Sequence, residues 1–152
     1  MAVKKYKSIM PEVTLKYRKG NVKKVKISSS SDVYEIAMEL FNQDTLEINE
    51  EFIALYLNAS NNTIAWFKVS QGGITGTVVD VRHIIKTALD TNAVSIILMH
   101  NHPSGNCTPS QNDINRTREL VAAAKLFNIR VHDHIIVTDD NGYFSMSDKD
   151  LI

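Results

Sequence analysis

The sequence lacks several features that would place it in a disulfide-rich or membrane class. Its 152 residues include one cysteine, Cys107, which excludes an intramolecular disulfide and any zinc site built from several cysteines. No apolar run reaches the length of a transmembrane helix, and residues 1–10 lack the apolar core of a signal peptide. Internal repeats and low-complexity segments are also absent. We therefore expect one globular domain, located in the cytoplasm and without a membrane partner.

Positive charge is scarce outside the N-terminal part of the chain. Residues 1–26 hold nine Lys or Arg and one acid, Glu12, which leaves eight of the 17 basic and 16 of the 17 acidic residues for the rest. A basic arm of this kind can contact nucleic acid or an acidic protein. It can equally be a lysine-rich edge hairpin that protects a sheet from aggregation, and the sequence leaves both interpretations open.

The spacing of apolar residues predicts strands alternating with helices. Residues 13–17 and 22–27, on either side of Lys19-Gly20-Asn21, alternate as in a β-hairpin, and apolar residues recur at helical spacing over 33–41. Further strands are expected at 52–57, 64–69, 95–99, 131–137 and 143–145, with helices after Asp80 and from Ser110, the last turning Ile114, Val121, Ala124 and Phe127 inward. This order predicts an α/β sheet covered by helices, with residues 1–45 as an extension packed on a domain formed by 46–152.

One stretch, residues 100–113, concentrates the polar chemistry. His100 and His102 are two residues apart, so an extended backbone projects both imidazoles from one face. Asp113 can add a carboxylate oxygen from the start of the following helix. Two histidines, one carboxylate and one open position form the ligand set of a catalytic zinc, whose bound water becomes acidic. A competing interpretation makes Ser110 and Asp113 only the N-cap and third residue of a helix.

These residues carry a resemblance to a known family. The pattern His-x-His, seven residues, Ser, two residues, Asp resembles the JAMM motif of JAB/MPN-type zinc metalloproteases. The wider string His-Asn-His-Pro-Ser-Gly, followed by Pro-Ser-x-x-Asp, is similar to the bacterial RadC family, and the resemblance covers about residues 50–145. It implies a three-layer α/β/α MPN fold, similar to the cytidine deaminase architecture. It also implies a bound Zn²⁺ and cleavage of peptide or isopeptide bonds in a protein substrate.

The resemblance also suggests the remaining parts of such a site. RadC-like sequences place a glutamate before a strand in a Glu-x-Phe pattern, which Glu50 matches and which makes it the expected general base. Strand alternation puts Glu50 and Glu51 on opposite faces, so that only one can reach the metal, and Glu51 is the alternative. Ser110 matches the JAMM serine, which implies an oxyanion-stabilising hydroxyl. His134 lies in a recurring family string and is expected either to support the ligands or to be an ordinary strand histidine.

Other functions were weighed against a zinc peptidase. A nucleobase deaminase needs His-x-Glu and a Cys-x-x-Cys pair, which residue 102 and the lone cysteine exclude. A non-catalytic MPN scaffold usually lacks ligands, whereas here every ligand position is filled. A DNA-repair role depends on the basic arm alone, because only a hairpin and a helix stand where RadC relatives carry a helix-hairpin-helix-like region. Cys107 can be a fourth ligand, a nucleophile or a bystander.

Overall fold

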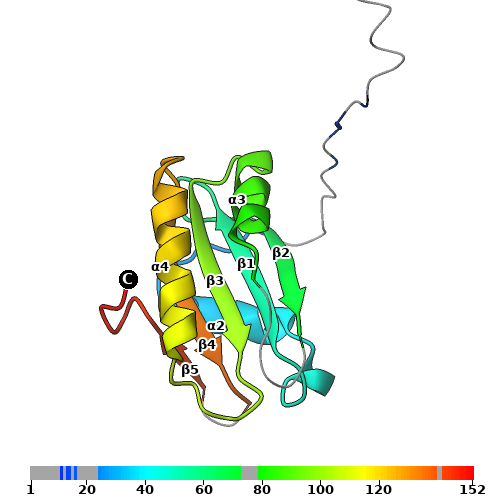
Figure 1. Cartoon of the computed structure of the whole chain (residues 1–152), viewed down its shortest axis with the longest axis vertical. Coiled ribbons are helices and arrows are strands. Elements are labelled where there is room, and N and C mark those ends of the chain that lie inside the picture. The colour runs from blue at the N-terminus through cyan, green and yellow to red at the C-terminus, as the bar shows by residue number, and fades with distance from the viewer. Residues whose placement is uncertain (1–10, 12, 15, 17–23, 73–78, 140–141) are drawn as a thin grey trace, which may run out of the picture.

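The computed structural model describes residues 11, 13–14, 16, 24–72, 79–139 and 142–152, and this part of the chain forms an α/β fold (Figure 1). The predicted hairpin at 13–27 lies mostly outside the described residues. The elements are α2 (Ser30–Leu40), the short 3₁₀ helix η1 (Gln43–Thr45), β1 (Glu51–Leu57), β2 (Thr63–Gln71), α3 (Val81–Asp90), β3 (Ser95–Asn101), α4 (Gln111–Lys125), β4 (Arg130–Val137) and β5 (Tyr143–Ser145).

The strands form one sheet in the order β2-β1-β3-β4-β5. β1 is antiparallel to both β2 and β3, while β3 and β4 run parallel and are connected through α4. All residues of β1 and β3 are buried, as their nearly continuous apolar sequences predict for central strands. The segment after β3 therefore leaves the sheet at its middle, where open α/β sheets commonly place their sites.

Helices cover both faces of the sheet, which confirms the predicted α/β/α layering. In Figure 1, α3 and α4 lie on the near face and α2 on the far face. Alternate residues of β1 and β3 supply the two halves of the core. Phe52, Ala54, Tyr56, Ile96 and Leu98 pack with α3 and α4, and Ile53, Leu55, Leu57, Ile97 and Met99 pack with α2. Because α2 shares this core, it belongs to the same packed body as the sheet.

The helices begin where the sequence places capping side chains. Asp80 accepts a hydrogen bond from the backbone of Arg82 at the start of α3, and Ser110 forms a capping box with Asp113 at the start of α4. The expected inward face of α4 is partly wrong. Phe127 lies beyond the helix end and is 49% exposed. The buried residues of α4 are Thr117, Leu120 and Ala124.

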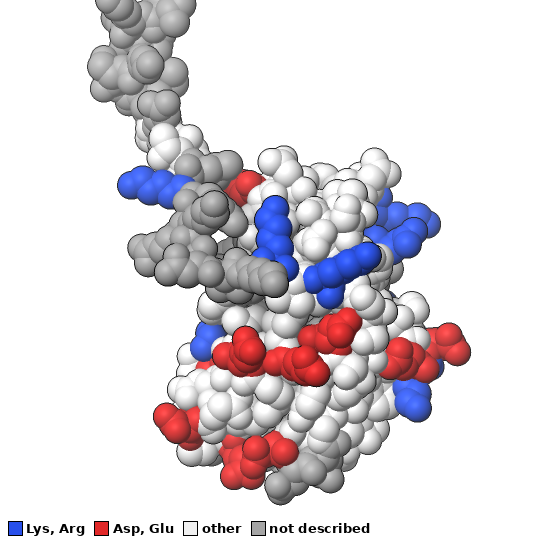
Figure 2. Space-filling model, turned by 180° about the vertical axis from the view of Figure 1, so that it is seen from behind, with Lys and Arg blue, Asp and Glu red and all other residues white. Residues whose placement is uncertain are grey.

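Acidic side chains form a band on the α2 side of the molecule, with Lys and Arg side chains above it and at its edges (Figure 2). Figure 2 shows this face, with Asp and Glu forming a band across it. Helix α2 contributes Asp32, Glu35 and Glu39 and carries no Lys or Arg. Such a surface repels the phosphates of nucleic acid, which require basic partners. Within the described residues, no helix combines the length and apolar composition that crossing a bilayer requires.

Asn101 joins the end of β3 to the segment before β1. Its side chain is completely buried, and its Oδ1 accepts a hydrogen bond from the backbone N–H of Glu51 at 2.7 Å. Its Nδ2 donates to the carbonyl oxygens of Leu46 and Asn49 at 2.6 and 2.8 Å. One amide therefore satisfies three backbone groups that burial would otherwise leave unpaired. These bonds fix the path of the chain immediately before and after Glu50.

We expect Asn101→Leu to lower the free energy of unfolding by about 2–5 kcal/mol, because it removes these three hydrogen bonds from a buried position. Urea denaturation of the purified protein measures this change. Asn115→Leu, an exposed position on α4, is the control and should stay within about 0.5 kcal/mol of the wild type. Equal effects of the two substitutions would contradict the conclusion that the hydrogen bonds of Asn101 fix the path of the chain around Glu50.

Candidate metal centre

The end of β3 and the first turn of α4 bring His100, His102 and Asp113 together. The Nε2 atoms of the two imidazoles lie 2.9 Å apart. Asp113 Oδ1 is 3.5 Å from His100 Nε2, and its Oδ2 is 3.5 Å from His102 Nε2. One ligand atom from each residue falls within 4.8 Å of the others. Among the described residues, these three form the metal-binding group, and Cys107 is not part of it.

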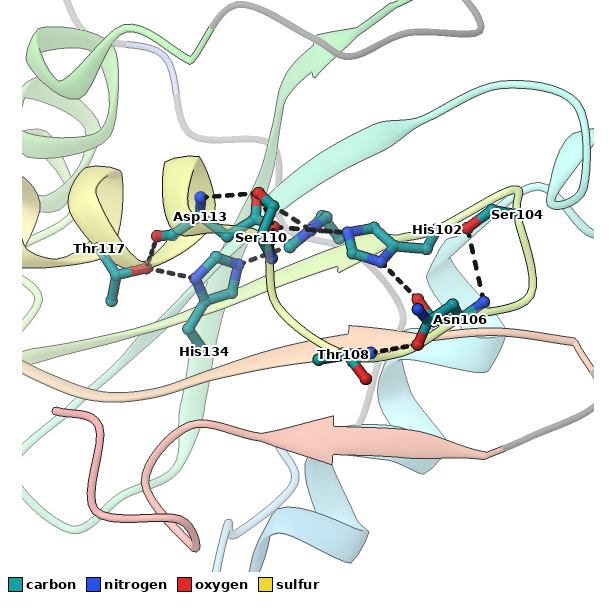
Figure 3. A network of polar contacts seen from close by, with 9 residues as sticks. His102, Ser104, Asn106, Thr108, Ser110, Asp113, Thr117 and His134 are labelled. Carbon is teal, nitrogen blue, oxygen red and sulfur yellow. Dashed lines mark hydrogen bonds and ion pairs between the residues drawn. The ribbon is translucent and has the colours of Figure 1, made fainter.

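The loop after β3 fixes the orientation of the His102 ring (Figure 3). His102 Nδ1 lies 2.6 Å from the carbonyl oxygen of Asn106. A carbonyl has no proton to give, so Nδ1–H is the donor and Nε2 of the neutral ring keeps its lone pair. The loop folds back at Gly105, which has φ of 76° and whose N–H donates to the His102 carbonyl. A glycine adopts this backbone conformation without the steric penalty of a side chain.

The capping box of α4 holds the Asp113 carboxylate. Asp113 Oδ2 accepts hydrogen bonds from the Ser110 backbone N–H at 2.7 Å and from the Ser110 hydroxyl at 2.6 Å. The Ser110 oxygen in turn accepts from the backbone N–H of Asp113. The cap and the carboxylate ligand are therefore the same structure and do not exclude each other. The expected oxyanion role of Ser110 remains a prediction.

His100 is buried near the end of β3. Its side chain is 1% exposed, and its ring stacks on Phe52 with centroids 5.7 Å apart. Its Nδ1 lies 2.7 Å from His134 Nε2, so His134 directly contacts a candidate ligand. This places the ring of His134 beside the site, while His132 on the same strand is only half-buried. The other ring nitrogen of His100, Nε2, faces His102 and Asp113.

The local electrostatics favour an anionic Asp113 and unprotonated rings at His100 and His134, while they favour a proton on His102. Burial lowers the pKa of His100 to about 4, although the Asp113 charge acts against this. Burial opposes a charge on His102 too, but hydrogen bonds to Asp113 and Asn106, with the nearby charge of Glu50, raise its pKa. Burial of Asp113 is outweighed by both histidines and Ser110, which hold its pKa well below the usual range. Burial lowers the pKa of His134 far below the ordinary value.

The two candidate bases lie on opposite faces of β1. In the antiparallel pairing of β1 with β3, Phe52 stands opposite His100. The ladder ends at this pair and Glu50 precedes β1, but the charge of Glu50 raises the pKa of His102, so the two side chains are close enough to interact. Glu51 faces the α2 side, is 3% exposed and forms an ion pair with Lys68 at 3.0 Å. Of the two, Glu50 is the acid whose charge acts on a candidate ligand, and its role as the base remains a prediction.

The donor set fits a zinc ion. His102 presents a lone pair at Nε2, the His100 nitrogen faces it at 2.9 Å, and a carboxylate oxygen lies near each. Two unprotonated nitrogens at this distance repel unless a cation or a proton lies between them. Imidazole and carboxylate are ligands that zinc accepts, and three protein ligands leave the fourth position open.

Thr117 is a residue of this site that the sequence analysis missed. It is fully buried on α4, and its hydroxyl lies 2.6 Å from His134 Nδ1 and 2.6 Å from the carbonyl oxygen of Asp113. Its distance in sequence from Asp113 could have indicated that it lies near the site. Thr117 follows Asp113 by four residues, which puts both on one face of a helix.

Comparisons with known proteins show the family of this chain. A family model described as a RadC-like JAB domain matches residues 27–151. The chain is 39% identical to a UPF0758 protein of Flavobacterium johnsoniae over 126 residues, which cover 83% of this chain and 53% of that protein. It is 51% identical to the UPF0758 protein YfjY of Escherichia coli over 88 residues, covering 58% and 55% of the two chains. The chain spans about half the length of these curated relatives.

We expect the purified, dialysed protein to hold about one zinc per chain, because one three-ligand site is present. His102→Ala and Asp113→Ala should each remove it. Elemental analysis by plasma mass spectrometry gives the stoichiometry, and His83→Ala, an exposed histidine on α3, is the control that keeps the metal. Full zinc content in both ligand variants would refute the site.

Proposed function

Since the chain belongs to the family of RadC-like JAB domains, we propose that it is a zinc-dependent hydrolase of amide bonds, a peptidase or isopeptidase. The observation that carries this proposal is the convergence of His100, His102 and Asp113, with the charge of Glu50 acting on His102. A structural zinc site would be closed by four protein ligands, whereas the described group offers three. An open position on the metal, with a carboxylate near it, is what hydrolysis needs.

The roles of the ligand residues follow from their contacts. His100 and His102 would hold zinc through Nε2, and Asp113 through a carboxylate oxygen. When bound, zinc polarises a carbonyl group and lowers the pKa of a water molecule toward neutrality. The protein supports these ligands through Ser110, which fixes the Asp113 carboxylate, and through the Asn106 carbonyl, which fixes the ring of His102.

Glu50 is the group that moves protons in this proposal. Its carboxylate takes a proton from the attacking water and passes it to the departing amide nitrogen, so that the C–N bond breaks with a neutral amine as product. The backbone around Glu50 is fixed on both sides. Gly72 donates its N–H to the Glu50 carbonyl at 2.9 Å, and Asn101 holds the neighbouring residues.

Ser110 is proposed to assist at the carbonyl oxygen of the substrate. Its hydroxyl proton points to Asp113 Oδ2 at 2.6 Å. To donate to a developing oxyanion, the hydroxyl must rotate away from the carboxylate, which keeps the Ser110 backbone N–H as a partner. We therefore expect Ser110→Ala to lower the turnover rate by about 10²–10³, as loss of one oxyanion donor does elsewhere.

The substrate class is proposed from the reaction type. A peptide or a protein carrying an isopeptide bond is the expected partner. The acidic α2 face does not favour nucleic acid, and the basic residues that would bind it precede Lys26, where most of the chain lies outside the described residues. The direct test incubates the zinc-loaded protein with a peptide library and identifies new termini by mass spectrometry. Cleavage that is lost with a chelator and restored by zinc is expected. Intact peptides at equimolar enzyme would contradict it.

Glu50→Gln should abolish this cleavage while the zinc content stays at the wild-type level, because a proton carrier is not a ligand. Glu51→Gln is the matched control, one residue away on the opposite face, and should retain cleavage per folded molecule. The two variants are compared by turnover rate and by metal analysis of the same samples. Loss of activity in Glu51→Gln with an active Glu50→Gln would reverse the assignment.

Cys107→Ser should leave both zinc content and cleavage unchanged, because the thiol lies outside the group of converging ligands. The assay is run beside wild type treated with a chelator or a thiol-alkylating reagent. Inactivation by the chelator alone is expected. A wild type that alkylation inactivates and chelation does not would identify a cysteine nucleophile instead.

A further inference from the structure

His134 is buried in the site without a role in the steps proposed above. Its side chain is 1% exposed on β4, enclosed by the edge of Phe52, by His100 and by Thr117. Both of its ring nitrogens are engaged, Nε2 by His100 and Nδ1 by the Thr117 hydroxyl. Neither nitrogen contacts a carboxylate, and an unpaired charge in such a place is costly. The ring is therefore neutral, with one N–H.

The position of that proton follows from the Thr117 hydroxyl. Thr117 Oγ1 lies 2.6 Å from the carbonyl oxygen of Asp113, and two oxygens this close repel unless a proton lies between them. A carbonyl cannot supply one, so the hydroxyl donates to Asp113. Oγ1 then meets His134 Nδ1 at 2.6 Å with its lone pair. The contact is a hydrogen bond only if His134 carries its proton on Nδ1.

The same reasoning fixes the position of the proton on the His100 ring. With its proton on Nδ1, His134 offers a lone pair at Nε2, and His100 Nδ1 lies 2.7 Å from it. His100 must then donate from Nδ1. A neutral His100 with hydrogen on Nδ1 has none on Nε2, the atom that faces His102 and Asp113. The hydroxyl proton of Thr117 and the ring protons of His134 and His100 therefore each have one position that satisfies all of these contacts.

We infer that Thr117 and His134 are positioning residues that keep the Nε2 atom of His100 free of hydrogen and directed at the metal position. We call the hydrogen bonds from His100 through His134 to Thr117 the relay. The relay ends at Asp113, because the Thr117 hydroxyl donates to the backbone carbonyl of this residue, which is itself a candidate ligand. Figure 3 shows Thr117 between the first turn of α4 and the His134 ring. The hydrogen bonds thus connect two of the three ligands through protein groups alone. The inference rests on the metal site of the proposed function, but not on hydrolysis.

Zinc affinity of paired variants tests this inference without an activity assay. Thr117→Val keeps the shape of the side chain and removes the hydroxyl, whereas Thr117→Ser keeps the hydroxyl. Thr87→Val on α3 is the control, because Thr87 makes the same bond to the carbonyl four residues earlier, that of His83, far from any candidate ligand. Affinities are measured by competition with a chromophoric chelator.

We expect Thr117→Val to bind zinc about 10–100-fold more weakly, the usual effect of removing a group that orients a metal ligand. Thr117→Ser and Thr87→Val should stay within about threefold of the wild type. Wild-type affinity in Thr117→Val would overturn the inference. If the wild type itself binds no zinc, the proposed function fails instead, and the proton positions still test the relay.

Nuclear magnetic resonance of ¹⁵N-labelled histidines in the wild type reads those positions directly and depends on no variant. Long-range proton–nitrogen correlations distinguish a ring protonated at Nδ1 from one protonated at Nε2. We expect His134 to carry hydrogen on Nδ1 with or without zinc, His100 to do so in the zinc-loaded protein, and Thr117→Val to lose this preference at His134. A His134 ring with hydrogen on Nε2 in the wild type would overturn the relay.

Discussion

The pairing of β1 with β3 is the constraint on which the site depends. Because Phe52 stands opposite His100, its ring packs against His100 and His134, and the chain enters β1 with Glu50 close enough for its charge to act on His102. A slip of one residue would turn Glu51 toward the histidines and bury Phe52 on the other face. Asn101 reinforces this register from inside the His-x-His motif, where it points away from the metal position and bonds to Glu51 and to the segment before β1.

Much of the site could be predicted because its ligands are local in sequence. His100, His102 and Asp113 belong to one stretch of the chain, and the two rules that place them, alternation in a strand and the cap of a helix, act over a few residues. The buried strands were equally plain, since β1 and β3 are almost entirely apolar. The choice between Glu50 and Glu51 needed the register of two distant strands. Alternation alone shows only that the two residues face opposite ways.

The resemblance offered His134 as a support for the ligands, but the strand pattern alone could not choose between this role and an ordinary strand histidine, because the contact depends on an irregularity in the β3–β4 ladder. Ile96 pairs with Val131 and Ile97 with Asp133, so His132 is an extra residue, a β-bulge. The bulge allows Val131 and His134 to reach the same face, which strict alternation forbids. Val131 packs in the core under α3 and α4, and His134 reaches His100. The prediction that Phe127 points inward was wrong for a simpler reason. Helix α4 ends at Lys125, so the helical spacing no longer applies at residue 127.

The partners of the two histidines differ in a way that bears on the chemistry. His102 donates to a backbone carbonyl, a common partner of metal-binding histidines that raises the basicity of the ring. His100 contacts a neutral imidazole, which carries no negative charge and draws on its proton less than a carboxylate would. The ligand set then delivers little charge beyond that of Asp113. A metal held in this way would keep more of its own positive charge for a carbonyl oxygen, which is the property that the proposed hydrolysis of an amide requires.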